Sequence, residues 1–138
     1  MKTEVIQQLI DAAINARQRS YSPYSNFAVG AALLTQNGKI YSGANIESAS
    51  YTPTVCAERV SFFNAITNGE REFQGIAIVG GKASDAISAY CSPCGVCRQV
   101  MAEFCDPDFE IILFDGTAPK VYTLGELLPE SFSKDNIK

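Results

Sequence analysis

The stretch SPCGVCRQ, residues 92–99, opens a predicted helix that runs from about residue 93 to Phe104. Proline is favoured at the first position of a helix, so both cysteines of this stretch lie in the first turn. A second stretch, CAER at residues 56–59, opens another predicted helix that ends near Thr67. Backbone dipoles at a helix start favour the thiolate form of cysteine. Both stretches therefore place reactive sulfur at a helix N-terminus.

An apolar strand follows each of these helices, at Ile76–Val79 and Phe109–Phe114. Strands and helices that alternate in this order require right-handed crossovers and a parallel portion of sheet. The two helix starts then lie at the same edge of the sheet, which is where open α/β sheets usually bind ligands. The two stretches can therefore converge on one point.

The other segments predict a helix, a hairpin and a short C-terminal helix. A helix is expected over residues 4–17 with Thr3 as its N-cap. The strands 29–35 and 39–45 are joined by an Asn-Gly turn, residues 121–122 add an edge strand, and 123–126 have the spacing of a capping box. We expect a single domain over residues 1–138 of the α/β class, a three-layer α/β/α arrangement with a central mixed sheet of about five strands.

Composition excludes several classes of protein. The chain has 11 basic and 15 acidic residues and a net charge of −4, without a basic cluster that would bind phosphates, so we expect no nucleic-acid partner. No apolar run is long enough for a membrane span, and the first residues lack a secretory signal, so we expect a cytoplasmic protein with reduced thiols. The chain contains no histidine, which excludes Ser-His-Asp and Cys-His catalysis.

All five cysteines fall within one stretch of the chain, and in a reducing compartment such clustering indicates a metal site. Cys56, Cys94 and Cys97 would hold one Zn²⁺ per chain and leave one coordination position open, as in catalytic zinc sites. Water in that position becomes a hydroxide nucleophile near neutral pH. Glu58 lies close enough to move its proton without being a ligand. Arg59 would offset the negative charge by donating to the cysteine sulfurs.

Two other interpretations of the cysteines stay open. They could be ordinary buried cysteines, because free cysteine is often buried. Alternatively, Cys91, Cys94 and Cys97 with Cys105 have a spacing that suits an iron–sulfur cluster or a four-thiolate structural zinc. That interpretation leaves the CAER stretch unexplained and ranks second. Glu58 could also be a solvated helix residue, the usual fate of glutamate.

Short motifs along nearly the whole chain resemble those of the small homotetrameric, zinc-dependent cytidine deaminases. The combination of Cys-x-Glu and Pro-Cys-x-x-Cys is the pattern of zinc deaminases. The shared segments are YSNFAVGAA at 24–32, NIE at 45–47, CAER at 56–59, PCGVCRQ at 93–99 and ELLP at 126–129. The resemblance implies a cytidine deaminase-like fold and hydrolytic deamination of cytidine and deoxycytidine to uridine and deoxyuridine plus ammonia, in pyrimidine salvage.

The resemblance also implies four substrate-binding positions near the metal. Phe27 would stack on the pyrimidine, and Asn45 and Glu47 would bind the ribose 3′-hydroxyl. The main-chain N–H of Ala57 would contact the base carbonyl. From the residues alone, Phe27 could equally be a core residue, and Asn45 and Glu47 could be turn residues after a strand.

Three further positions are implied at a contact between subunits of a homotetramer. Ala49 and Tyr51 would shape the ribose end of the site, and Phe132 would enter the site of a neighbouring subunit. The alternative for Phe132 is that it folds back onto its own core. Ser50 and Cys91 depart from the family pattern, although neither stands at a catalytic position.

Two other functions are weighed against a nucleoside deaminase. The first is a zinc deaminase of another aminopyrimidine nucleoside, such as blasticidin S. The second is a non-enzymatic zinc or iron–sulfur module. The NIE segment and Phe27 favour the plain nucleoside.

Overall fold

The five strands of this computed structural model, which describes residues 1–138, form one mixed sheet in the order β2-β1-β3-β4-β5. The strands are β1 (Phe27–Thr35), β2 (Ile40–Ala44), β3 (Phe73–Lys82), β4 (Glu110–Phe114) and β5 (Pro119–Thr123). β3 and β4 pair in parallel, and every other neighbouring pair is antiparallel. The predicted mixed sheet is confirmed.

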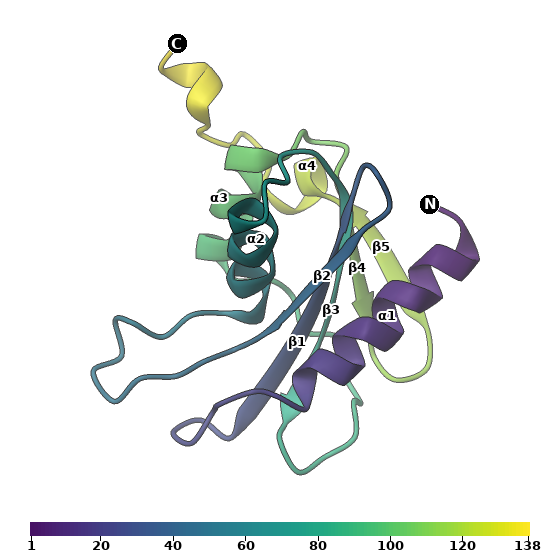
Figure 1. Ribbon diagram of the computed structural model, residues 1–138, viewed down its shortest axis with the longest axis vertical. Helices are drawn as coiled ribbons and strands as arrows, with labels where there is room; N and C mark the ends of the chain where they lie inside the picture. Colours follow the sequence, from purple (N-terminus) through teal and green to yellow (C-terminus); the bar gives the residue numbers. More distant parts are fainter.

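Helices cover both faces of this sheet. They are α1 (Thr3–Arg17), α2 (Ala57–Thr67), α3 (Gly95–Phe104) and α4 (Leu124–Leu127), followed by a 3₁₀ turn at Lys134–Asn136. α1 lies on one face, and α2 and α3 lie on the other (Figure 1). The predicted three-layer arrangement is therefore confirmed. None of the helices combines the length and the apolar character that spanning a bilayer would require.

The alternating side chains of β3 join the two helical layers to the sheet. Ile76 and Ile78 pack in the same cluster as Phe62 of α2, whereas Ala77 and Val79 pack against residues of α1. All four β3 side chains are fully buried. Successive residues of a strand point to opposite faces, so one strand serves both layers. Burying each large aliphatic side chain contributes about 1.5–3 kcal/mol.

Close packing of α1 on β1 depends on Gly30. A Cβ at this position would lie 2.0 Å from the carbonyl oxygen of Ala13, so only glycine allows this approach. At the end of α1, the Arg17 guanidinium donates to the carbonyl oxygens of Ala28, at 3.0 Å, and of Lys82, at 2.6 Å. Arg17 thereby ties the beginning of β1 to the end of β3.

Three details of the sequence-based prediction are wrong. Thr3 is not the N-cap of α1; Lys2 occupies that position without a capping side-chain bond, because the helix begins one residue earlier than expected. β3 extends well beyond 76–79, because its two flanking ends also pair with β1. α3 begins at Gly95, with Cys94 as its N-cap.

Candidate metal centre

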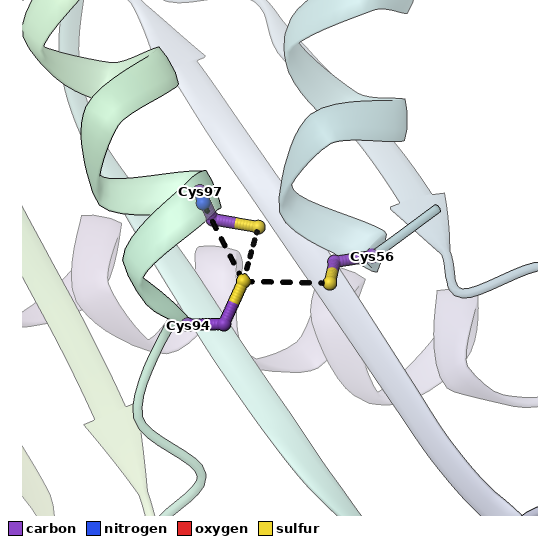
Figure 2. Close-up of side chains that lie close together, drawn as sticks. All are labelled: Cys56, Cys94 and Cys97. Carbon is purple, nitrogen blue, oxygen red and sulfur yellow. Dashed lines mark hydrogen bonds between the residues drawn. The ribbon is translucent and has the colours of Figure 1, made fainter. Parts of the chain in front are cut away.

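Three cysteines meet where the first turns of α2 and α3 lie side by side (Figure 2). Cys56 is the N-cap of α2 and Cys94 is the N-cap of α3, with Cys97 one turn further along α3. The Cys94 sulfur accepts a hydrogen bond from the main-chain N–H of Cys97. Their positions in the first turns place the thiols near the N–H groups of two helix starts, which favour negative charge on sulfur. The predicted convergence of the two stretches is confirmed.

The sulfur positions fit a single zinc ion. The Sγ atoms of Cys56 and Cys94 are 3.7 Å apart, those of Cys94 and Cys97 are 3.5 Å apart, and all three lie within 4.8 Å of one another. Zn–S bonds of about 2.3 Å in tetrahedral geometry separate two sulfurs by about 3.8 Å. Three soft thiolates are a donor set that zinc prefers, and three ligands leave one tetrahedral position open.

Cys91 and Cys105 lie outside this set. The group that can hold a metal comprises Cys56, Cys94 and Cys97 only. Cys91 packs against the backbone of Gly80 in β3, so closely that a Cβ there would lie 2.7 Å from its sulfur. The structure therefore does not support the alternative of four thiolates from 91, 94, 97 and 105.

The pKa values of Cys56 and Cys97 are shifted in opposite directions. Hydrogen bonds from the Cys97 thiol and from Arg59 lower the pKa of Cys56 to about 5. The bond that Cys97 makes to Cys56, together with burial, raises the pKa of Cys97. The surroundings of Cys56 therefore favour its thiolate form, and binding of a cation requires the thiols of the cluster to lose their protons.

Glu58 lies buried beside the cluster, in the first turn of α2. Its side chain is 4% exposed, and its Oε1 atom has no hydrogen-bond partner. Burial raises the pKa of Glu58 to about 7, and the negative charge of Cys56 adds to this effect. A buried carboxyl oxygen without a partner is costly unless a ligand supplies one. Glu58 is therefore poised to exchange protons near neutral pH with a molecule bound at the cluster.

Arg59 faces the same sulfurs from α2. Its Nη2 atom lies 3.5 Å from the Cys56 sulfur, and its Nε atom is buried without a partner. The hydrogen bond to Cys56 raises the pKa of the guanidinium further. Arg59 thus places a positive charge beside the Cys56 sulfur.

Three of the predicted substrate-binding residues lie at or bond to the segment around the start of β1. Phe27 is the first residue of β1 and is 41% exposed, so it is not a core residue. Asn45, directly after β2, is 9% exposed and contacts the main chain of β1 through its side-chain amide. The hydroxyl and main-chain N–H groups of residues 24–25 surround the Glu47 carboxylate. The hydrogen bond from Ser25 lowers the pKa of Glu47.

Ala57 is fully buried at the first position of α2, where a main-chain N–H has no partner within the helix. The other three predicted positions are exposed within one chain. Ala49 is exposed and Tyr51 is 76% exposed, on the segment between β2 and α2 that projects from the body (Figure 1). Phe132 is 62% exposed, and its carbonyl oxygen accepts a hydrogen bond from Gln99. Phe132 therefore does not fold back onto its own core.

Ser25 is a site residue that the sequence analysis missed. Its hydroxyl contacts both Glu47 and the main chain of Phe27. No periodic pattern marks this serine, because its carboxylate partner lies 22 residues further along the chain. The signal that could have found it is its place two residues before Phe27 in a shared motif.

Residues 3–112 match the model of the cytidine and deoxycytidylate deaminase zinc-binding region. The chain belongs to the cytidine deaminase family. Family members include the cytidine deaminase of Sporosarcina psychrophila, which is 42% identical over 134 residues, covering 96% of this chain and 94% of that protein. The blasticidin-S deaminase of Bacillus cereus is a more distant relative, 34% identical over 110 residues and covering 78% of each chain.

The fold of the family agrees as well. The crystal structure of the cytidine deaminase from Burkholderia pseudomallei superposes with a TM-score of 0.84 at 44% identity, covering 96% of this chain and all of that chain. The matched family region is a zinc-binding region, and Cys56, Cys94 and Cys97 form a cluster able to bind one metal ion. The chain is accordingly a zinc-dependent enzyme of the deaminase family.

Proposed function

We propose that this enzyme hydrolyses cytidine and deoxycytidine to uridine and deoxyuridine plus ammonia, and so serves pyrimidine salvage. The observation that carries the proposal is the buried Glu58 carboxyl, whose Oε1 atom has no partner, beside three cysteine sulfurs at two helix starts. Similarity to the cytidine deaminases supports the choice of substrate. We place the enzyme in the cytoplasm, a reducing compartment in which its five free cysteines stay reduced.

Cys56, Cys94 and Cys97 would hold the zinc, which when bound acidifies water to a pKa of about 7 and so supplies a nucleophile. Glu58 takes a proton from the attacking water and delivers it to N3 of the base, while the water oxygen adds to C4. Glu58 then takes the remaining proton from the hydroxyl added at C4 and delivers it to the 4-amino group. The C4–N bond breaks as the C4 carbonyl forms, and the amino group leaves as ammonia. A positioned acid–base group of this kind contributes about 10²–10⁴-fold to the rate.

The residues around the cluster would bind the nucleoside. In this proposal the Phe27 ring stacks on the pyrimidine, and the free N–H of Ala57 at the start of α2 donates to the base carbonyl. Asn45 and Glu47 bind the ribose 3′-hydroxyl. Both cytidine and deoxycytidine carry that hydroxyl, so both are expected substrates.

An ultraviolet assay of the purified protein tests this function directly. The absorbance on the long-wavelength side of the cytosine band should fall as cytidine and deoxycytidine are converted to the uracil products, whereas free cytosine, which lacks the ribose, should react far more slowly. Blasticidin S is included because of the blasticidin-S deaminase relative. Turnover of blasticidin S without turnover of cytidine would show that blasticidin S, and not cytidine, is the substrate.

Arg59→Gln should leave zinc bound and lower kcat/KM. Zn²⁺ with three thiolates carries one net negative charge, and the Glu58 carboxylate adds a second, which opposes ionisation of water unless Arg59 compensates. Loss of such a supporting contact typically costs about 10–100-fold in metal affinity or activity. Metal analysis combined with steady-state kinetics measures both quantities.

The companion variant carries Arg59→Gln together with Cys56→His. Histidine is a neutral ligand and lowers the negative charge of the ligand set by one, so it should recover part of the lost activity. Unchanged activity in the single Arg59→Gln variant would show that the charge argument is wrong.

We further propose a homotetramer whose sites are completed by neighbouring subunits. The exposed Phe132, and the exposed Ala49 and Tyr51 on the projecting segment, support this proposal, since within one chain these side chains are left open for contact with a neighbouring subunit. Enclosing the site against bulk water strengthens the charge interactions inside it.

Phe132→Ala should raise KM and lower kcat/KM by roughly 2- to 12-fold, the equivalent of about 0.5–1.5 kcal/mol for an aromatic contact. Chains carrying Glu58→Gln, mixed with chains carrying Phe132→Ala, should form hybrids with partly restored activity. In such hybrids an intact Glu58 meets an intact Phe132 from another chain. A fully active monomer in light scattering, or verified hybrids without recovery, would contradict shared sites.

A further inference from the structure

The first residues of β1 extend beyond the end of β2. The last pair between these strands joins Gly30 to Ala44, so Phe27 has no strand neighbour on that side. The polar main-chain groups of Phe27 are held there by side chains instead. Its N–H donates to the Ser25 hydroxyl at 3.0 Å, and its carbonyl oxygen accepts from Nδ2 of Asn45 at 2.8 Å.

Beyond the end of β2, the side chain of Asn45 makes the hydrogen bonds to β1 that a longer β2 strand would make. While Nδ2 holds Phe27, the Oδ1 atom accepts from the main-chain N–H of Val29 at 2.9 Å and from the Ser20 hydroxyl at 2.5 Å. The Asn45 main-chain N–H also donates to the carbonyl oxygen of Val29, at 3.2 Å. The side-chain amide of Asn45 thus bonds to the main chain of both Phe27 and Val29, beyond the last pair between β1 and β2.

Ser25 connects this arrangement to Glu47. The serine hydroxyl donates to Oε2 of Glu47 while it accepts from the N–H of Phe27. Oε1 of the same carboxylate accepts from the main-chain N–H groups of Tyr24, at 3.0 Å, and Ser25, at 3.1 Å. A bond to a charged acceptor is stronger than one between neutral groups, so the hydroxyl direction is well fixed.

The opposite side of Phe27 is held by the sheet and by α1. Phe27 pairs with Lys82 of β3. Arg17 donates to the carbonyl oxygen of Lys82 and to that of Ala28, the residue after Phe27. The backbone of Phe27 is thereby fixed on both sides, although the ring itself is 41% exposed. A fixed main chain limits where the exposed ring can lie, so less has to be ordered when the ring stacks on a base, which reduces the entropic cost of binding.

We infer that Ser25 is a positioning residue, whose hydroxyl links the Glu47 carboxylate to the Phe27 main chain and so fixes the ring that meets the substrate base. This inference rests on the proposed nucleoside deamination. It assigns to Ser25 an effect on substrate binding that acts through Phe27 and leaves the proton transfer by Glu58 unchanged.

The test compares Ser25→Ala with Ser25→Thr and with Ser22→Ala as the matched control. Ser22 lies in the same loop, and the one hydrogen bond of its side chain joins it to the Ser20 hydroxyl. Ser25→Ala should raise KM for cytidine by about 2- to 12-fold with kcat within about twofold, the range expected when one side chain must be ordered on binding. Ser25→Thr, which keeps the hydroxyl, and Ser22→Ala should both match the parent.

A double-variant cycle separates action through Phe27 from direct substrate contact. In the Phe27→Ala background, Ser25→Ala should cause no further rise in KM, because the ring to be positioned is gone. An equal rise in both backgrounds would overturn the inference, as would an unchanged KM in Ser25→Ala, or loss of binding in Ser25→Thr.

Hydrogen exchange of the free protein keeps the inference testable if the proposed function fails. Absence of cytidine turnover by the parent would refute the function only. Faster exchange of the Phe27 amide in Ser25→Ala than in Ser22→Ala would then still support the positioning role. Equal exchange of that amide in the two variants would overturn it.

Discussion

Replacing Glu58 with Gln is expected to lower kcat for cytidine by about 10²–10⁴-fold while the zinc content stays at one per chain. Glutamine has the size of glutamate but cannot accept the proton of the attacking water. Glu58 is buried, and burial raises its pKa to about 7, so its removal eliminates a group suited to proton exchange at neutral pH. The cysteine ligands are untouched by this change.

Steady-state kinetics and metal analysis of the same preparation measure this result. Glu4→Gln is the matched control, because Glu4 is an exposed carboxylate in the first turn of α1. The control should behave as the parent does. Activity of Glu58→Gln within about tenfold of the parent would show that Glu58 is not the proton shuttle.

The second large effect is loss of the metal. Cys56→Ala, Cys94→Ala and Cys97→Ala should each lower the zinc content from one per chain to a small fraction and abolish turnover. The zinc affinity should fall by more than the roughly 10–100-fold that is typical of removing a residue that only hydrogen-bonds to a metal ligand. Because the metal links the first turns of α2 and α3, thermal stability should also fall in these variants.

Cys91→Ala and Cys105→Ala are the matched controls for the metal site. Both cysteines lie outside the group of sulfurs that can share one ion, so both variants should keep zinc and activity. Metal analysis of the five single variants decides the ligand set. Zinc lost with Cys91→Ala and retained with Cys56→Ala would contradict the assignment.

The pattern of cysteines could be interpreted from sequence because helix starts are local structures. Cys56 and Glu58 lie within one turn of α2, and Cys94 and Cys97 lie within one turn of α3. Capping and first-turn geometry depend on residues three or four positions apart, so their spacing alone predicts how they are presented. Apolar runs likewise indicated which strands are buried, and the order of helices and strands indicated a mixed sheet.

Strand ends were harder to predict than the strands themselves. β3 was expected over 76–79 but continues through Gly80 and Gly81, which pair with Val29 and Ala28 of β1. Glycine pairs carry no strand signal of their own, and their extended conformation depends on a neighbouring strand. The same holds for Cys91, whose separation from the metal cluster follows from its packing against Gly80.

The amino-acid sequence by itself determined the thiols near the starts of two helices, the nearby acid and the mixed α/β order, because each follows from periodicity or spacing within a few residues. Only the tertiary structure decided which sulfurs share one point and that Asn45 and Glu47 hold the main chain around Phe27. These contacts join residues 16 to 38 positions apart. They form only after sheet register and close helix packing have placed distant segments together, and that placement is a property of the whole core.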